Sequence, residues 1–145
     1  MPCKSKEKDL EDAKLVAKTF GVRLLEINLT DTYEKLEQEI NEKIEEKLSD
    51  EAQINIKPRL RMIALYAIAQ NHNYLVMGTG NLCERMVGYT TKWGDSASDF
   101  NPIANFTVEE VLKIGEILGV PEQIIKKAPS DGLSEKSDEE KMGIT

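Results

Sequence analysis

Residues 77–95 of the sequence read MGTGNLCERMVGYTTKWGD and hold several side chains that could act on a small ligand. Glu84 offers a carboxylate, Thr79 offers a hydroxyl, and Lys92 offers a positive charge beside Trp93, the only tryptophan of the chain. The stretch follows the apolar run NYLVMG, which has the pattern of a strand buried in a parallel sheet. Ligands bind beyond the carboxyl ends of such strands, so Thr79 is expected to lie in a crevice.

Each of these residues also has a plainer interpretation. A carboxylate near the start of a short helix, such as Glu84, can hold Mg²⁺ or simply face solvent. Apart from its place, Thr79 is an ordinary turn residue. Trp93 can stack on a flat ring or anchor its loop to the core. Asp95 and Asp99 are loop carboxylates, which are common in turns.

Positive charges gather around this stretch although the chain has a formal net charge of −7. A cationic cluster beside a Gly-rich strand end predicts phosphate binding, whereas each base taken singly is typical of a protein surface. Arg59 and Arg61 lie two positions apart on one expected helix and therefore point in different directions, so at most one of them is expected in the site. The cluster comprises Lys57, Arg59, Arg61, Arg85 and Lys92.

Composition limits the classes of protein to consider. The 145 residues fit one domain or part of one, and 40% of them are hydrophobic. The acidic balance argues against nucleic acid as a partner. Two cysteines exclude a disulfide framework, and Cys83 is expected to be a small buried residue. With no signal peptide and no apolar run of about 20 residues, we expect a cytoplasmic protein without a membrane partner.

Hydrophobic periodicity predicts an α/β fold with parallel strands. Only two strands are visible, although a parallel sheet usually has several. We therefore expect an incomplete domain, with further material before Met1 and after Thr145. The expected helices are 6–20, 33–48, 56–70, 107–118 and a short 121–127, the expected strands are 22–29 and 73–78, and residues 130–145 are expected to be flexible.

Four longer segments closely resemble the ammonia-dependent NAD⁺ synthetases of the ATP pyrophosphatase superfamily. They are KPRLRMIALYAIA, LVMGTGNLCERMVGYTTKWGDSASDFNPIA, KAPSDGL and SDEEKMGIT. The G-T-x-N-x-x-E and G-Y-x-T-K-x-G-D pieces together make the resemblance specific, and it covers essentially the whole chain. It implies a parallel-sheet, Rossmann-like fold of the adenine nucleotide α-hydrolase type, with residues 1–145 forming one NAD synthase domain that is incomplete at its N-terminus.

The resemblance also implies an activity and a set of site residues. Such ligases activate the carboxylate of deamido-NAD⁺ with MgATP to form an acyl-adenylate, and ammonia then gives NAD⁺, with AMP and pyrophosphate released. By position in the motifs, Thr79 and Ser130 are expected to contact ATP and Glu84 to hold Mg²⁺. Three further residues are expected to contact deamido-NAD⁺, namely Arg59, Lys92 and Asp99. No residue of the chain is singled out as a catalytic group.

The sequence departs from the family pattern at three points. Val108 stands where many members carry an ATP-contacting lysine, and the family's C-terminal His-Lys pair would lie beyond Thr145. The Ser-Gly-Gly-x-Asp-Ser phosphate loop has no counterpart in these residues, since none of the nine glycines adjoins another. That loop, its strand and its helix are expected before Met1.

Three interpretations therefore stay open. The first is an NAD⁺ synthetase that uses free ammonia, because no glutaminase domain is visible. The second is a non-catalytic remnant that binds dinucleotide or dimerises, as the homodimeric family does, with helix 33–48 or 57–70 as the contact. The third is another ATP pyrophosphatase, a GMP synthetase or a tRNA-thiolating enzyme. The acidic charge argues against tRNA, and the G-Y-x-T-K-x-G-D loop argues against both members of the third group.

Overall fold

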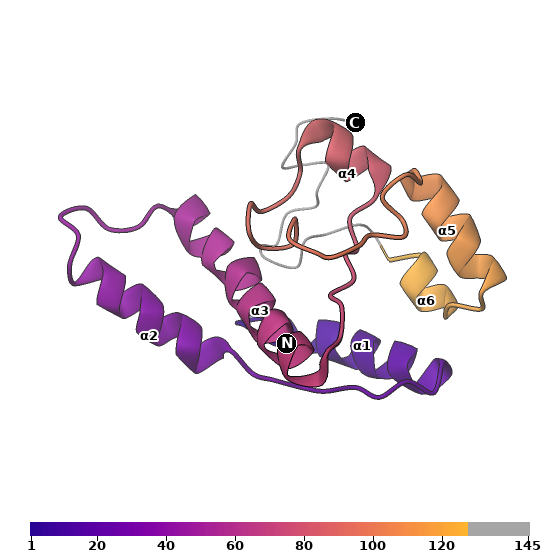
Figure 1. Cartoon of the computed structure of the whole chain (residues 1–145), viewed down its shortest axis with the longest axis horizontal. Coiled ribbons are helices and arrows are strands. Elements are labelled where there is room, and N and C mark those ends of the chain that lie inside the picture. Colours follow the sequence, from indigo (N-terminus) through magenta and orange to yellow (C-terminus); the bar gives the residue numbers. More distant parts are fainter. Residues whose placement is uncertain (128–145) are drawn as a thin grey trace.

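A computed structural model of the chain describes residues 1–127, which form six α-helices joined by non-helical segments (Figure 1). The expected flexible segment 130–145 and Ser130 lie outside the described residues. None of the six helices is long and apolar enough to cross a membrane. They are α1 (Glu7–Thr19), α2 (Thr30–Asn41), α3 (Asp50–His72), α4 (Leu82–Val87), α5 (Val108–Ile117) and α6 (Glu122–Ile125).

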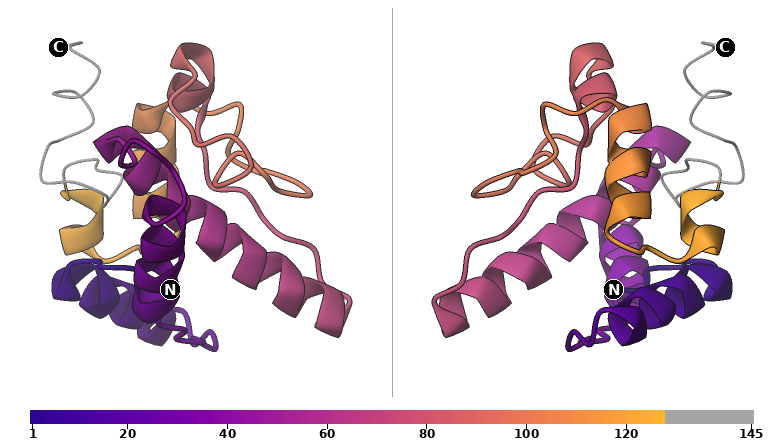
Figure 2. Two further views of the ribbon diagram at one scale, coloured as in Figure 1. Left: turned by 90° about the vertical axis from the view of Figure 1, so that its left-hand side faces the viewer. Right: turned by 90° about the vertical axis from the view of Figure 1, so that its right-hand side faces the viewer.

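The helices pack mainly as neighbours in sequence. α2 lies against α3, and α5 lies against α6. α4 and α1 lie at opposite ends of the molecule in two perpendicular directions of view (Figures 1 and 2). The loops that follow α4 are therefore on the side of the molecule away from α1.

Helix α3 begins earlier than the predicted range 56–70. The hydroxyl of Ser49 accepts the backbone N–H of Ala52 (3.2 Å) and so caps the helix at Asp50. Pro58, predicted in the first turn, is consequently inside the helix and buried. Because proline has no backbone N–H, one main-chain hydrogen bond of the helix is missing there.

Helix α2 ends earlier than predicted, at Asn41 rather than near Leu48. The Asn41 side-chain oxygen accepts the backbone N–H of Leu48 (2.9 Å) and closes the connecting loop. The apolar stripe predicted on one long helix is thereby divided, with Ile44 exposed in the loop.

The buried core joins the N-terminus to α2 and α3. Cys3, Leu29, Tyr33 and Leu60 form one buried cluster. The N-terminal segment is tied to α3 by Arg61, whose Nε donates to the Met1 carbonyl at 3.1 Å and whose Nη2 donates to the Ser5 hydroxyl at 3.1 Å. Arg61 thus holds the N-terminal segment of the chain on α3.

The two expected strands do not form ladders within residues 1–127. Segment 22–29 has no strand pairing, and one backbone hydrogen bond joins it to the N-terminus, from Leu29 N–H to the Pro2 carbonyl (2.8 Å). Segment 73–78 forms a single parallel bridge, and of its apolar side chains only Val76 is buried. The strand prediction is wrong for both segments in this chain, because a strand is completed by a paired neighbour and the described residues place no strand beside them.

An ion-pair cluster attaches the end of α6 to α1. Lys127 Nζ donates to Asp9 at 2.7 Å and to Asp12 at 2.8 Å, and the Gln123 amide also donates to Asp12 (3.4 Å). The hydrogen bond from Lys127 holds the pKa of Asp12 below its ordinary value, and the bonds to Asp12 and Asp9 raise the pKa of Lys127. The cluster therefore makes stability depend on pH.

We expect the cluster to stabilise the fold most between about pH 5 and pH 9. A carboxyl group with a lowered folded pKa stabilises above its unfolded pKa, and its contribution is lost as pH falls through the folded value. A lysine with a raised folded pKa stabilises below its unfolded pKa, and its contribution is lost as pH rises through the folded value. When the pH is lowered from 6 to 3, the free energy of unfolding measured by urea melts should therefore fall less in Asp12→Asn than in the unaltered chain.

The matched control is Glu122→Gln, which removes a carboxylate that pairs with Lys126 on the same exposed helix turn and should leave the acid sensitivity unchanged. Such exposed pairs contribute little to stability. Equal acid sensitivity in Asp12→Asn and the unaltered chain would contradict the role of the cluster.

Candidate functional site

The site begins where segment 73–78 meets the chain around Asp99. Gly78 N–H donates to the Phe100 carbonyl (2.7 Å), and Asp99 N–H donates to the Val76 carbonyl (2.9 Å), around the parallel bridge between Met77 and Phe100. A Cβ on Gly78 would lie 2.6 Å from the Ser98 hydroxyl, so only glycine allows this approach. Thr79 follows directly and is exposed.

Glu84 lies in the first turn of α4 and takes part in a capping box. The Asn81 side chain accepts the Glu84 N–H (3.0 Å), and Glu84 Oε2 accepts the Asn81 N–H (2.7 Å). The Asn101 amide donates to the Gly80 carbonyl (2.8 Å) and holds the same turn from the side. The predicted metal-binding carboxylate is thus placed at a helix start beside the strand end.

The surroundings of Glu84 limit how a metal ion would be held. Among residues 1–127 no group of three or more His, Cys, Asp or Glu side chains could bind a metal together. Mg²⁺ commonly takes one or two protein carboxylates and completes its shell with phosphate oxygens and water. One carboxylate at Glu84 fits that pattern only when a phosphate-bearing substrate is also present.

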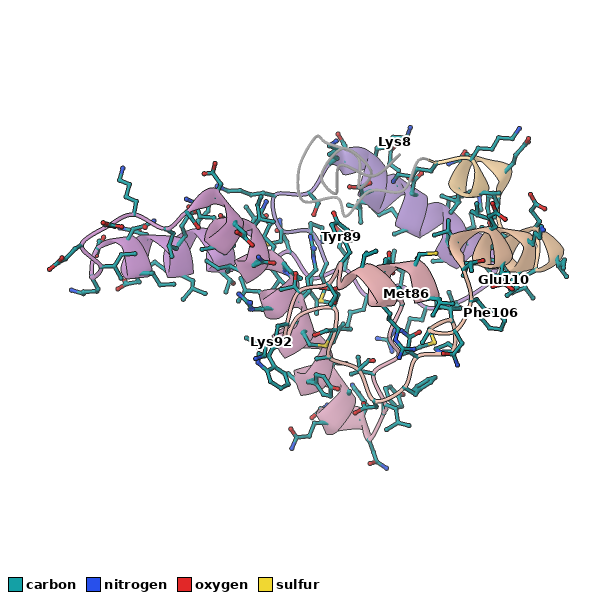
Figure 3. All side chains as sticks on the ribbon, turned by 90° about the horizontal axis from the view of Figure 1, so that it is seen from above. Lys8, Met86, Tyr89, Lys92, Phe106 and Glu110 are labelled. Atoms are coloured by element: carbon teal, nitrogen blue, oxygen red, sulfur yellow. The ribbon has the colours of Figure 1, made fainter. Side chains whose placement is uncertain are left out.

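The loop of residues 88–96, called here the 88–96 loop, lies against α3. Arg59 Nε donates to the Lys92 carbonyl (3.1 Å), and the Thr91 hydroxyl donates to the Asn55 side chain (2.7 Å). Figure 3 shows Lys92 beside this helix. Two residues expected at the dinucleotide are thereby brought together across 33 positions of sequence.

Asp95 holds the turn of the 88–96 loop from within. Its Oδ2 accepts the Thr90 hydroxyl (2.6 Å) and its Oδ1 accepts the Thr91 N–H (2.8 Å). Gly94 is buried, and a Cβ there would lie 3.0 Å from Pro58 Cβ, so the turn packs tightly on α3. The prediction of Asp95 as a turn residue agrees with these bonds.

Asp99 is also engaged in the fold. Its Oδ2 accepts the Val76 N–H (2.7 Å) and its Oδ1 accepts the Tyr66 hydroxyl (3.3 Å). Desolvation and the nearby Asp99 carboxylate raise the pKa of Tyr66, so the phenol stays a donor at neutral pH. Asp99 thus links segment 73–78 to α3 in addition to any contact with a ligand.

The predicted cationic cluster is only partly assembled. The carbonyl of Lys92 meets Arg59, but the other three bases serve other parts of the fold. The Lys57 ammonium lies over the Tyr33 ring, 5.6 Å from its centroid. Arg85 donates to the chain after Phe100, at the Ala104 carbonyl (3.1 Å). Arg61 is tied to the N-terminus, which confirms that it and Arg59 point apart.

Two side chains that hold the site were not singled out from the sequence, and one prediction about a cysteine is wrong. Asn55 and Asn101 make their contacts with residues 36 and 21 positions away, and a contact over such a distance leaves no local signal in the sequence. Cys83, predicted to be buried, is exposed, because the short helix α4 buries none of its residues.

Asp95→Asn is expected to loosen the 88–96 loop while costing only about 1 kcal/mol of global stability. The amide has one acceptor oxygen where the carboxylate has two, so the Thr90 hydroxyl can be met only by the amide nitrogen, and the charge that strengthens the hydrogen bonds to Thr90 and Thr91 is lost. Trp93 reports on the change, because it is the only tryptophan. Time-resolved anisotropy should show a larger fast component in the variant. Asp31→Asn, an equal charge change on α2, is the control, and an unaltered Trp93 decay in Asp95→Asn would refute the loop-holding role.

The chain is similar to known proteins along its whole length. A family profile described as NAD synthase matches residues 1–145. The NH(3)-dependent NAD(+) synthetase of Carboxydothermus hydrogenoformans is 46% identical over 146 residues, covering 100% of this chain and 60% of that protein. The chain therefore spans about 60% of the length of this relative.

Two solved structures are similar in fold. The structure titled NMN synthetase from Francisella tularensis matches with a TM-score of 0.90 and 35% identity, over 97% of this chain and 58% of that one. The NH3-dependent NAD synthetase from Campylobacter jejuni, in complex with the nitrate ion, matches with a TM-score of 0.76 and 29% identity, over 85% and 52%.

These matches confirm the predicted fold class. The described helices and extended segments are parts of a parallel-sheet fold of the adenine nucleotide α-hydrolase type. The family profile covers every residue of the chain, including the strand-end turn, α4 and the 88–96 loop. The chain belongs to the NAD synthase family.

Proposed function

We propose that this protein acts in NAD⁺ biosynthesis by amidating deamido-NAD⁺ with free ammonia, through an acyl-adenylate formed from ATP, with release of AMP and pyrophosphate. The observation that carries the proposal is the contact of Arg59 with the Lys92 carbonyl at 3.1 Å. It assembles two of the three expected dinucleotide residues at one place, although they are far apart in sequence. Asp99, the third, lies at the adjoining strand end.

The other assignments follow the same motifs. We assign Arg59, Lys92 and Asp99 to deamido-NAD⁺, Thr79 to ATP, and Glu84 to Mg²⁺. Ser130, the second residue expected at ATP, lies outside the described residues. When bound, Mg²⁺ would neutralise charge that develops on the pyrophosphate leaving group. The side chains of the protein itself bind and orient the substrates. The cationic side chains contact the phosphates, and Glu84 presents a carboxylate at the start of α4.

The setting of the enzyme is part of the proposal. We place it in the cytoplasm, as a single domain that works as a homodimer. α3 supplies an exposed apolar side chain suited to a subunit contact, since Ile63 is 67% exposed. The test of the dimer is sedimentation of the chain and of Ile63→Glu, which should shift the equilibrium to monomer.

The direct test supplies the complete protein, and in parallel the 145-residue chain, with deamido-NAD⁺, MgATP and ammonium, and measures NAD⁺ and AMP by chromatography. The chain alone, without the phosphate loop, is expected to form no AMP. Formation of both in equal amounts supports the proposed reaction. Calorimetry with deamido-NAD⁺ is run in parallel. Binding of deamido-NAD⁺ without formation of NAD⁺ and AMP would favour the non-catalytic dinucleotide-binding module. If the protein shows no binding and forms no product, both interpretations are overturned.

A second candidate function is amidation of nicotinate mononucleotide. The observation in its favour is the TM-score of 0.90 with the structure titled NMN synthetase, higher than the 0.76 found for the NAD synthetase from Campylobacter jejuni. Product formation from nicotinate mononucleotide and from deamido-NAD⁺ at equal concentration separates the two candidates. The preferred substrate is the one with the larger kcat/KM.

A further inference from the structure

Trp93 has an unusual conformation at the tip of the 88–96 loop. Its φ is +64°, a left-handed conformation that is rare for a bulky aromatic residue. Its side chain is 72% exposed, so the ring does not anchor the loop to the core of the described residues. Of the two roles that the sequence left open for Trp93, its exposure in the described residues favours contact with a ligand.

The strained backbone at Trp93 is supported from several sides. The Trp93 N–H donates to the Ser96 hydroxyl (3.1 Å), and Gly94 packs against Pro58 of α3. Asp95 fixes the preceding turn through its two hydrogen bonds. An uncommon conformation persists where the surroundings determine it, and such places are often ligand contacts. The indole is therefore presented to solvent by a loop that is organised before any ligand arrives.

The ring also has a charged neighbour. Lys92 Nζ lies over the Trp93 ring, 5.5 Å from its centroid. A cation and an aromatic face side by side suit a ligand in which a flat ring and an anionic group are close together. A nucleotide has both, in its base or pyridine ring and its phosphate.

We propose that Trp93 stacks on a planar ring of the nucleotide substrate while Lys92 meets the adjacent anionic group. This inference rests on the proposed function and adds the residue that recognises the ring. Stacking covers apolar surface of the indole that is now exposed, and the fixed loop limits the entropy lost on binding. Deamido-NAD⁺ carries two candidate rings, adenine and nicotinate, and both present the same flat face.

The experiment follows Trp93 fluorescence of the full chain during titration with deamido-NAD⁺, nicotinate mononucleotide and AMP, with calorimetry on the same samples. Deamido-NAD⁺ is expected to quench the emission. AMP and nicotinate mononucleotide are the two halves of this ligand. If only AMP quenches, the ring that stacks on Trp93 is adenine, and if only nicotinate mononucleotide quenches, it is nicotinate. The second result also favours the mononucleotide as the substrate.

Variants separate stacking from a structural role. Trp93→Leu should raise the Kd of the quenching ligand roughly tenfold or more, and Trp93→Phe, which keeps a flat ring, should recover most of the affinity. Tyr74→Leu removes another exposed aromatic ring, outside the loop, and should leave Kd unchanged. Equal thermal melts of the three variants show that the fold is intact.

Two results would overturn the inference in different ways. Heat of binding with deamido-NAD⁺, but no quenching and an unchanged Kd in Trp93→Leu, rejects the stacking role and leaves the proposed function standing. No heat of binding with any of the three ligands rejects the proposed function for this chain, and the stacking role with it.

Discussion

In the complete protein, with the phosphate loop that is expected before Met1, Glu84→Gln is expected to lower the rate of NAD⁺ formation by about a hundredfold or more. The side-chain oxygen of glutamine can still accept the Asn81 N–H, so the capping box of α4 is kept. The negative charge that attracts Mg²⁺ is lost. The substitution therefore removes the charge of the proposed metal ligand while keeping the hydrogen bond to the Asn81 N–H.

A matched control exists on α5. Glu110 occupies the same position in a second capping box, where its Oε2 accepts the Thr107 N–H at 2.7 Å. Glu110→Gln should keep its turnover, since α5 carries no expected metal ligand. The comparison can also be made with Mn²⁺ binding in the presence of ATP, which Glu84→Gln should weaken. Near-normal turnover and Mn²⁺ affinity in Glu84→Gln would remove Glu84 from the metal site.

Arg59→Ala is expected to raise the Kd for deamido-NAD⁺ by about ten- to a hundredfold. A hydrogen bond made by a charged group contributes roughly 1.5 to 3 kcal/mol. Arg59 has two tasks in the proposal: it contacts the ligand, and it donates to the Lys92 carbonyl and so holds the 88–96 loop on α3. Calorimetry with deamido-NAD⁺ measures the combined loss.

Two further variants divide those tasks. Arg59→Lys keeps the positive charge but lacks the Nε donor, so it should recover only part of the affinity and leave the loop loose by Trp93 anisotropy. Arg61→Ala removes the neighbouring arginine, which is tied to Met1 and Ser5, and should lower stability without changing Kd. An equal change of Kd in Arg59→Ala and Arg61→Ala would show that Arg59 has no particular place in the site.

Local signals predicted the helices well where the physical cause is local. Thr107 and Glu110 marked the start of α5, which the structure confirms as a capping box. Helix α1 follows the predicted range to within one residue at each end. The same kind of signal misplaced the start of α3, because Pro58 is compatible with a first turn and Ser49 supplied an earlier cap.

Strands were less predictable for a physical reason. The apolar runs 22–29 and 73–78 have the composition of strands, but pairing depends on a neighbour that composition does not contain. In the described residues the only such pairing is the bridge between Met77 and Phe100. Val76 is buried there, whereas Leu75 remains 72% exposed, so a run that is apolar throughout is covered on one side only.

By itself, the sequence determined the family, the fold class and the identities of the proposed ligand residues, because these depend on motifs of consecutive side chains. The tertiary structure alone decided which of those residues meet. Arg59 reaches the Lys92 carbonyl and Asn55 reaches Thr91 over 33 and 36 positions, and Arg61 turns to the opposite side of α3. Such contacts arise from the packing of the 88–96 loop on α3, and local propensity carries no information about distances between segments far apart in the chain.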